Sequence, residues 1–424
     1  MTEKIKAIRG MPDILPKDTA LWLGFEQHWR QLVAAYGYEE IRFPIVESTG
    51  LFKRSIGEIT DIVEKEMFTF NSKDNESLTL RPEGTAGCVR AGIEHGLLYH
   101  QVQRLWYSGP MFRYERPQKG RYRQFYQVGV EAFGLEGPDI DAEHIFMMKR
   151  LWGWLGVEAA VSLQVNSLGS SATRNEYRKQ LIDYFLKYEN ELDEDSKRRL
   201  HTNPLRILDS KNAAMAEIIH HAPKCHEHLD TESRVHFEGF LQLLTDAGIP
   251  YTVNPNLVRG LDYYNRTVYE WVTNSLGAQG TVCGGGRYDN LVAQLGGEPT
   301  PGVGLSAGID RIILLQQALG VLQTSGIDVY LLHFGDGAEQ KAFLLAEKMR
   351  TQIRDLRLVV HCGGGNFKQQ FKKADKIGAR LAFILGEEEV RTNTIGVKFL
   401  REAQEQRSIS INEIHQFLTQ YLGR

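Results

Sequence analysis

The part of the sequence that decides the fold runs from QRLWYSGPMFRYE (residues 103–115) through RPQKGRY (116–122) to RQFYQVGVEAFG (123–134). The two outer runs are apolar and aromatic and the short middle run is polar, which predicts two antiparallel strands joined by a loop. Arg113 lies at the end of the first apolar run, and Glu115 follows two residues later. Because side chains alternate along a strand, we expect these two groups on the same face.

The N-terminal part of the chain contributes a helix and a broken strand. Residues 18–36 carry apolar side chains at helical spacing, with Asp18 or Thr19 as the cap and Gly37 as the stop. The next run, EIRFPIVE (40–47), is strand-like but contains Pro44, which cannot donate a hydrogen bond to a sheet. We therefore expect Pro44 at an edge or an interface.

The second half of the chain changes character twice. Charged, leucine-spaced segments over about 170–247 predict a helical insertion, after which strand-like runs resume. QTSG (323–326) is a plausible linker, and strands and helices alternate beyond it. We predict an α+β domain over 1–325, built on an antiparallel sheet and containing the insertion, followed by a separate α/β domain over 326–424.

The composition is that of an ordinary globular protein. The chain has 424 residues, 42% of them apolar and 24% charged, which argues against disorder. No run approaches the roughly 20 apolar residues that cross a bilayer. The first residues contain no apolar signal segment, and the four cysteines form no CxxC pair, so we expect free thiols in a cytoplasmic protein.

The net charge of −3 conceals two basic windows. Residues 104–123 contain six Lys and Arg against one acid, and residues 350–380 contain eight against two. One such window is usually a solvated face. Two windows in different parts of one chain indicate contact with a polyanion at two points.

Phosphate-binding motifs of the common kinds are missing from the sequence. There is no G-x-x-x-x-G-K-[ST], and the glycines of GGGNF (363–367) do not match G-x-G-x-x-G. The remaining candidates are Arg113, Arg259 and Arg311. They could be salt-bridged surface arginines, or they could converge on nucleotide phosphates, which a guanidinium fork fits well. Sequence spacing does not decide between these readings.

One histidine-rich segment invites a metal assignment. HHAPKCHEH (220–228) offers four histidines and Cys225. A zinc site needs four ligands on a compact frame, and the predicted helical insertion already accounts for a polar segment here. We therefore expect no metal tightly held by the protein.

Taken together, these segments resemble class II aminoacyl-tRNA synthetases, and among them the bacterial type of the histidyl-tRNA synthetase family. The likeness covers nearly the whole chain. Three stretches are similar to the class motifs, and three more to histidyl or related enzymes. They are YGYEEIRFPIVE (36–47), MFRYERPQKGRYRQFYQVGVE (111–131), GVGLSAGIDR (302–311), LTLRPEGTAG (78–87), LVRGLDYYNRTVYEW (257–271) and TVCGGGRYDNL (281–291). Ser306 departs mildly from the third motif, where many members have glycine.

The resemblance implies ATP-dependent attachment of histidine to its tRNA through a histidyl-adenylate, with release of AMP and pyrophosphate. Arg259 and Arg113 are the implied catalytic residues. The implied histidine site contains Glu83, Thr85, Arg113, Gln127, Glu131, Arg259, Tyr263 and Tyr264. The implied ATP site contains Arg113, Glu115, Arg121, Phe125 and Arg311, with Mg²⁺ arriving with ATP and no tightly bound cofactor. A pocket selective for imidazole should pair its ring nitrogens with buried polar groups, and by resemblance Glu131 and Tyr264 do so.

The resemblance also implies partners for both basic windows. Arg116 and Gln118 would meet the acceptor end of the histidine tRNA, where arginine is well suited to read a guanine. Lys368, Lys372, Lys373 and Lys376 in the α/β domain would face its anticodon stem. Pro44 would lie at the interface of a homodimer.

Alternative interpretations remain open at this point. Glu83 could be an acid at a helix N-terminus, and Tyr264 a half-buried strand tyrosine. The whole chain could be a catalytically silent relative, such as a regulatory subunit of ATP phosphoribosyltransferase, or a threonyl or prolyl synthetase. The silent relative should lack the C-terminal unit and the catalytic arginine, whereas this sequence has both 326–424 and Arg259. The LVRGLDYY segment disfavours the other synthetases.

Overall fold

The structure is a computed structural model that describes residues 4–57, 60–208, 210, 212–277, 280–321 and 326–423. It divides into two compact units between residues 323 and 324, which are described separately. Most of the predicted linker lies outside the described residues. Within the described part of the chain, no helix is long and apolar enough to cross a membrane. All four cysteines are free thiols, as predicted.

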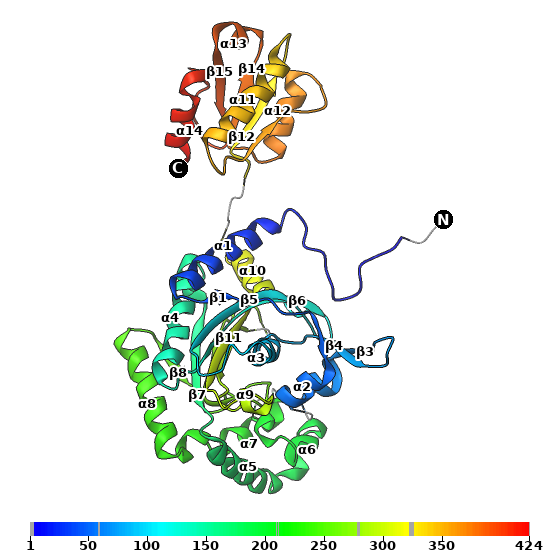
Figure 1. Ribbon diagram of the computed structural model, residues 1–424, viewed down its shortest axis with the longest axis vertical. Coiled ribbons are helices and arrows are strands. Elements are labelled where there is room, and N and C mark those ends of the chain that lie inside the picture. The colour runs from blue at the N-terminus through cyan, green and yellow to red at the C-terminus, as the bar shows by residue number, and fades with distance from the viewer. Residues whose placement is uncertain are drawn as a thin grey trace. The chain divides into compact units, whose positions relative to one another are not determined.

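The first unit is built on an eight-stranded sheet (Figure 1). Its strands, in spatial order, are β1 (Glu39–Glu40), β5 (Gln103–Phe112), β6 (Gln124–Phe133), β11 (Gly302–Gly308), β10 (Thr281–Arg287), β9 (Asn265–Val272), β7 (Ser162–Ser167) and β8 (Tyr251–Val253). The pairings from β5 to β7 are all antiparallel, which confirms the predicted core. The edge strands β1 and β8 pair in parallel, so the sheet as a whole is mixed.

Helices cover both faces of this sheet. One face packs against α1 (Thr19–Ala35), α4 (Pro138–Trp154), α8 (Thr231–Asp246) and α10 (Ile309–Ala318). The other face packs against α3 (Thr85–Glu94), α9 (Leu291–Gln294) and the remaining helices of the insertion. The predicted first helix is confirmed. It ends just before Gly37, whose φ of +72° suits a residue without a side chain.

A small antiparallel sheet lies beside the large one. Its strands, in spatial order, are β2 (Val46–Ser48), β4 (Ser77–Leu80) and β3 (Phe68–Asn71), and α2 (Thr49–Ile56) follows β2 directly. The predicted strand-like run at 40–47 is divided between β1 and β2. Pro44 lies in the irregular segment between these strands and is exposed.

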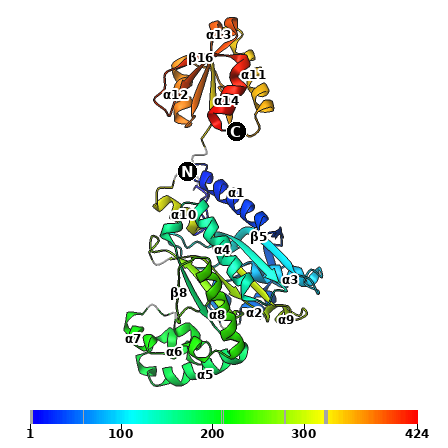
Figure 2. The same cartoon turned by 90° about the vertical axis from the view of Figure 1, so that its left-hand side faces the viewer.

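The described residues between β7 and β8 form helices and short turns, with no strand among them. The helices are α5 (Ser171–Leu186), α6 (Glu194–Leu200), α7 (Ala216–His220) and α8, and the first three lie together in Figure 2. Side chains of Ser170, Asp193 and Asp230 each accept a backbone N–H three residues ahead, which is why three of these helices begin where they do. α8 differs from the other three because it packs on the same face of the large sheet as α1 and α4, whereas the others pack on the opposite face.

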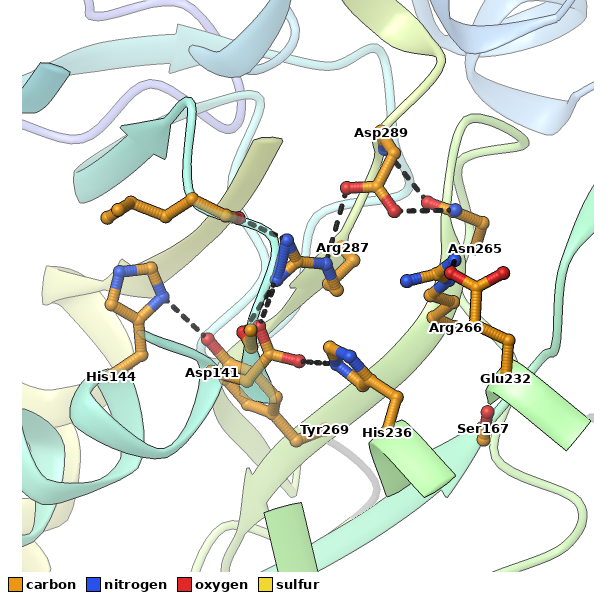
Figure 3. Close-up of polar contacts among 12 residues, drawn as sticks. Asp141, His144, Ser167, Glu232, His236, Asn265, Arg266, Tyr269, Arg287 and Asp289 are labelled. Carbon is orange, nitrogen blue, oxygen red and sulfur yellow. Dashed lines mark hydrogen bonds and ion pairs between the residues drawn. The ribbon is translucent and has the colours of Figure 1, made fainter. Parts of the chain in front are cut away.

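A buried ion network ties α8 to α4 and β10 (Figure 3). Arg287 of β10 and Asp141 of α4 are fully buried, and their Nη1 and Oδ1 atoms are 2.7 Å apart. His236 of α8 contacts the other oxygen of Asp141 at 2.8 Å, and Asp289 contacts Arg287 Nε at 3.2 Å. Burial acts to raise the pKa of Asp141, but His236 and Arg287 outweigh it, so the pKa lies below its ordinary value.

The second unit contains a five-stranded sheet of its own. Its strands, in spatial order, are β13 (Leu358–Val360), β12 (Val329–His333), β14 (Leu381–Leu385), β15 (Thr394–Phe399) and β16 (Arg407–Ser410). Its helices are α11 (Ala338–Gln352), α12 (Phe367–Lys376), α13 (Glu387–Thr392) and α14 (Ile414–Leu422). α11 and α14 contribute to one core, whereas α12 packs against a second core on other strand residues. The predicted alternation is present, but the short elements α13 and β16 were not predicted.

The ion network generates a test of stability. Asp141→Asn leaves Arg287 buried without its main counter-charge, so we expect the first unit to lose about 3–5 kcal/mol of unfolding free energy in denaturant titrations at neutral pH. The exposed Asp139→Asn, on the same helix, should cost less than about 1 kcal/mol.

The difference in unfolding free energy between wild type and Asp141→Asn should depend on pH. Because the folded pKa of Asp141 is lowered, its stabilisation is complete above the ordinary value of 3.8 and is lost as the pH falls through the folded pKa. The difference between wild type and Asp141→Asn should therefore narrow below that pH. A difference that is small at neutral pH, or unchanged on acidification, would contradict this assignment.

Candidate active site

A cavity of about 340 Å³ opens on the face of the large sheet that carries α3. It is lined by residues from β6, β9, β10 and β11, from the loop between β5 and β6, and from the segment before β9. All the residues that the sequence assigned to histidine and ATP line this cavity, with the exception of Glu131. They are Glu83, Thr85, Arg113, Glu115, Arg121, Phe125, Gln127, Arg259, Tyr263, Tyr264 and Arg311.

Strand β6 explains how one stretch of sequence supplies several of these groups. Phe125 and Gln127 line the cavity, whereas Val128 and Val130 pack in the core under α1, α4 and α10. The alternation of a strand therefore divides β6 into a polar face and an apolar face. Glu131, two pleats beyond Gln127, belongs to the cavity face.

Glu131 is fully buried and lies behind Thr85. Its Oε1 accepts hydrogen bonds from Thr85 Oγ1 at 2.8 Å and from the Tyr107 hydroxyl at 2.9 Å. Its Oε2 accepts one from the hydroxyl of Tyr288. Burial raises the pKa of Glu131 to about 8, although the three donors favour its charged form. The carboxyl group is thus fixed in position by three donors on different elements.

Glycines make room for this arrangement. Gly304 of β11 pairs with Glu131, and a methyl group there would overlap Oε2 of that carboxylate. Side chains at Gly84 and Gly129 would overlap the ring of Tyr107. These positions need glycine because of close approach.

Glu83 is an acid at a helix N-terminus, as one of the two interpretations expected, and it also borders the cavity. Its two carboxylate oxygens accept the backbone N–H groups of Thr85 and Ala86, at 2.7 and 2.9 Å, at the N-terminus of α3. Glu83 also lines the cavity, and burial raises its pKa. Tyr264 precedes β9, and it is buried rather than half-buried.

Three arginines, Arg113, Arg121 and Arg311, line the cavity and give it positive charge. Arg113 donates to the carbonyl of Pro82 at 2.9 Å, and its guanidinium lies 5.3 Å from the centre of the Phe125 ring. Arg311, at the start of α10, donates to the carbonyls of Gly120 and Thr281 at 3.0 and 2.7 Å. Burial, together with Arg113 and Arg121, lowers the pKa of Arg311 to about 10. Because these positive charges lower the pKa of a neighbouring arginine, a bound anion would be stabilised by all of them.

Arg259 adds a further positive charge to the same cavity from another part of the chain. It lies in the segment between β8 and β9, forms an ion pair with Glu270, and lies 5.5 Å from the centre of the Tyr264 ring. Gly284 of β10 leaves space for its guanidinium. The positive charge of Arg259 is among the causes that lower the pKa of Arg113, after burial, so the two cations act on each other.

The residues expected to contact tRNA lie elsewhere. Arg116 and Gln118 are exposed on the loop between β5 and β6 and do not line the cavity. Lys368, Lys372, Lys373 and Lys376 are all exposed on α12 in the second unit.

Several functional groups were missed from the sequence. Tyr107 and Tyr288 hold Glu131, and Glu270 is the partner of Arg259. Tyr288 and Glu270 fall inside the segments that carry the family resemblance, which was the available signal. Asp310 was missed as well. It lines the cavity, and burial raises its pKa to about 6. The cavity lining therefore combines carboxyl groups with several arginines, which suits a zwitterionic ligand beside a polyphosphate.

Comparison with known proteins gives the same assignment for both units. The family model described as histidyl-tRNA synthetase matches residues 10–312, and the model for an anticodon binding domain matches residues 328–421. The crystal structure of apo histidyl-tRNA synthetase from S. aureus is 36% identical in sequence, with a TM-score of 0.79, and the match covers 98% of this chain and 100% of that one.

Two more distant structures share the fold. Histidyl-tRNA synthetase from a Nostoc species is 20% identical, with a TM-score of 0.74, over 99% of this chain and 100% of that one. A Bacillus halodurans protein, titled as an ATP phosphoribosyltransferase regulatory subunit/histidyl-tRNA synthetase, is 21% identical, with a TM-score of 0.64, over 91% of this chain and 99% of that one. With its catalytic and anticodon-binding regions both matched, the chain belongs to the histidyl-tRNA synthetase family of class II ligases, which form aminoacyl-tRNA.

Proposed function

We propose that this chain charges the histidine tRNA in two steps, with ATP as the energy source and a histidyl-adenylate as the intermediate. The family supports the overall reaction, which joins histidine to tRNA. One observation carries the two-step proposal. Arg113 and Arg259, from distant parts of the sequence, line the same cavity as Glu83, and the Glu131 carboxyl group is buried directly behind Thr85 of that lining.

Glu131 and Tyr264 would read the imidazole ring. The imidazole carries at least one N–H donor, and the buried Glu131 carboxyl group, which three hydroxyl groups hold in place, presents a well-oriented acceptor oxygen. A side chain without a donor would leave Glu131 without its substrate partner, which is the basis of strong discrimination. Glu83 would accept the α-ammonium group, and Thr85, Gln127 and Tyr263 would complete this pocket.

In the first step, a carboxylate oxygen of histidine would attack the α-phosphorus of ATP, and the bond from that phosphorus to the oxygen of the leaving pyrophosphate would break. Both reactants are anions, so their approach is opposed by charge repulsion. Arg259 would contact the carboxylate and the α-phosphate from one side, and Arg113 the α-phosphate from the other. Positioning and charge stabilisation of this kind account for most of phosphoryl-transfer catalysis. In the second step a ribose hydroxyl of the tRNA would attack the histidyl carbonyl, releasing AMP.

The remaining cavity residues suit ATP. Phe125 would stack on the adenine, Arg311 would hold the distal phosphates or the adenine face, and Arg121 and Glu115 would complete the nucleotide site. Mg²⁺ would arrive with ATP and neutralise the pyrophosphate as it leaves.

We further propose that the protein acts as a cytoplasmic homodimer and binds tRNA through both basic windows. Pro44 lies beside the exposed apolar residues Ile45 and Val46, which supports this edge as the subunit interface. Arg116 and Gln118 would contact the acceptor end, and the α12 lysines the anticodon stem. A purely regulatory role is less well supported, since Arg259 lines the cavity and the anticodon-binding unit is present.

The role of Arg259 is tested by Arg259→Ala. We expect histidine-dependent exchange of pyrophosphate into ATP to fall by roughly 10²–10³-fold, because one of two charges at the α-phosphate is lost. Circular dichroism should report an intact fold, and the exposed Arg150→Ala should exchange at the wild-type rate. Exchange within a few-fold of wild type in Arg259→Ala would remove this residue from the mechanism.

The role of α12 is tested by Lys372→Glu/Lys373→Glu. Reversal of two phosphate contacts should raise the KM for tRNA in charging by about tenfold or more, with a weaker salt dependence, while pyrophosphate exchange stays intact. A matched control is Lys348→Glu/Arg391→Glu, which reverses two exposed charges on α11 and α13. Equal losses in the two double variants would contradict a specific role for α12.

A further inference from the structure

A second, smaller pocket lies beside Arg259 and has no place in the mechanism above. Its volume is about 80 Å³, room for only two or three water molecules. We call it the arginine pocket because Arg174, Arg178, Arg206 and Arg259 line it together with Asn203 and Asp262. Arg259 also lines the active-site cavity, so this one residue borders both spaces.

The arginine pocket forms where the helical insertion meets the segment before β9. Arg174 of α5 donates to the backbone carbonyl of Asp262 at 2.9 Å and to that of Tyr264. Asn203, which precedes a turn of 3₁₀-helix, donates to Asp262 Oδ1 at 2.9 Å. The insertion therefore holds the backbone of the segment that carries Arg259 and Tyr264, and the pocket is part of that junction.

Two of the arginines that line the pocket, Arg174 and Arg178, carry more positive charge than the described acid beside them can neutralise. Arg174 donates only to backbone carbonyls, and so does Arg178, whose partners are His201 and Thr202. Within the described residues, neither arginine forms a salt bridge with a carboxylate at close range, although both interact electrostatically with Asp262. Among the described residues that line the pocket, Asp262 is the one acid, and it lies beside both Arg174 and Arg178.

Asp262 does not cancel this excess. It accepts a hydrogen bond from Asn203 and supplies at most one negative charge, which is fewer than the two positive charges of Arg174 and Arg178. Arg259 has its own counter-charge in Glu270. Burial lowers the pKa of Arg174, as expected for a cation with too little neutralising charge around it.

From this geometry we infer that the arginine pocket is a binding site for a single phosphate group, next to the catalytic arginine but separate from the ATP site. Several guanidinium forks from different elements match the oxygens of a tetrahedral anion, and the volume admits one phosphate but not a nucleotide. The phosphate could belong to the backbone of a tRNA or be free in solution as inorganic phosphate. Only the first source depends on the proposed function.

Calorimetric titration of the full-length protein with inorganic phosphate tests the site without histidine, ATP or tRNA. The variants are Arg178→Gln, Arg178→Lys and the control Arg198→Gln, which changes an arginine of α6 that does not line the pocket. None of these residues lines the active-site cavity, so phosphate bound there is common to all the proteins.

We expect wild type and Arg198→Gln to bind one more phosphate than Arg178→Gln does, or to bind that phosphate at least about tenfold more tightly. Arg178→Lys should recover part of the lost phosphate binding. Equal phosphate binding by Arg178→Gln and Arg198→Gln, with both proteins folded by circular dichroism, would overturn the inference, whatever the outcome for the proposed function.

Charging assays then separate the two sources of phosphate. If a tRNA phosphate fills the arginine pocket, Arg178→Gln should raise the KM for tRNA several-fold, and inorganic phosphate should compete with tRNA in the wild type. If Arg178→Gln loses phosphate binding but keeps the wild-type KM for tRNA, the ligand is free phosphate. Both results support the site and differ only in the identity of its ligand.

Discussion

The buried carboxylate of Glu131 is the constraint on which the rest of the catalytic unit depends. A carboxyl group inside a sheet is costly unless it is fully hydrogen-bonded, and here Thr85, Tyr107 and Tyr288 donate to it from α3, β5 and the end of β10. The Glu131 side chain lies so close to β11 that a side chain at the paired position would overlap it, which explains why that position is Gly304. The close pairing of β6 with β11 and the position of Thr85 in the cavity lining are therefore both tied to this one carboxyl group.

The positive charges that line the cavity are held in fixed positions. Arg113, Arg259 and Arg311 all line it, and each is fixed by carbonyls, a carboxylate or a ring rather than free in solvent. Such preorganised cations stabilise developing negative charge without having to reorient. The insertion adds to this by holding the backbone next to Arg259, so a helical segment remote in sequence contributes to the geometry of the active site.

Much of the fold and most of the cavity residues could be predicted from the sequence, but on different grounds. The first helix, the strand pair at 103–134 and the alternating C-terminal unit follow from local periodicity, which one segment carries by itself. The cavity residues came from motif resemblance, because spacing along the chain does not show that Arg113 and Arg259 meet. Tyr107 and Glu270 were missed because their roles depend on which strand lies next to which. The short α13 and β16 have too few residues to show a period, and the packing of α8 against α4 is a tertiary contact.

The central claim is that this cavity activates histidine and rejects other amino acids. The most direct measurement is pyrophosphate exchange into ATP by the wild-type protein, with each of the standard amino acids supplied in turn and without tRNA. We predict exchange with histidine alone, because its ring can donate to the fixed Glu131 carboxylate while its carboxylate lies between two arginines. Exchange with a different amino acid, or with none, would contradict the account.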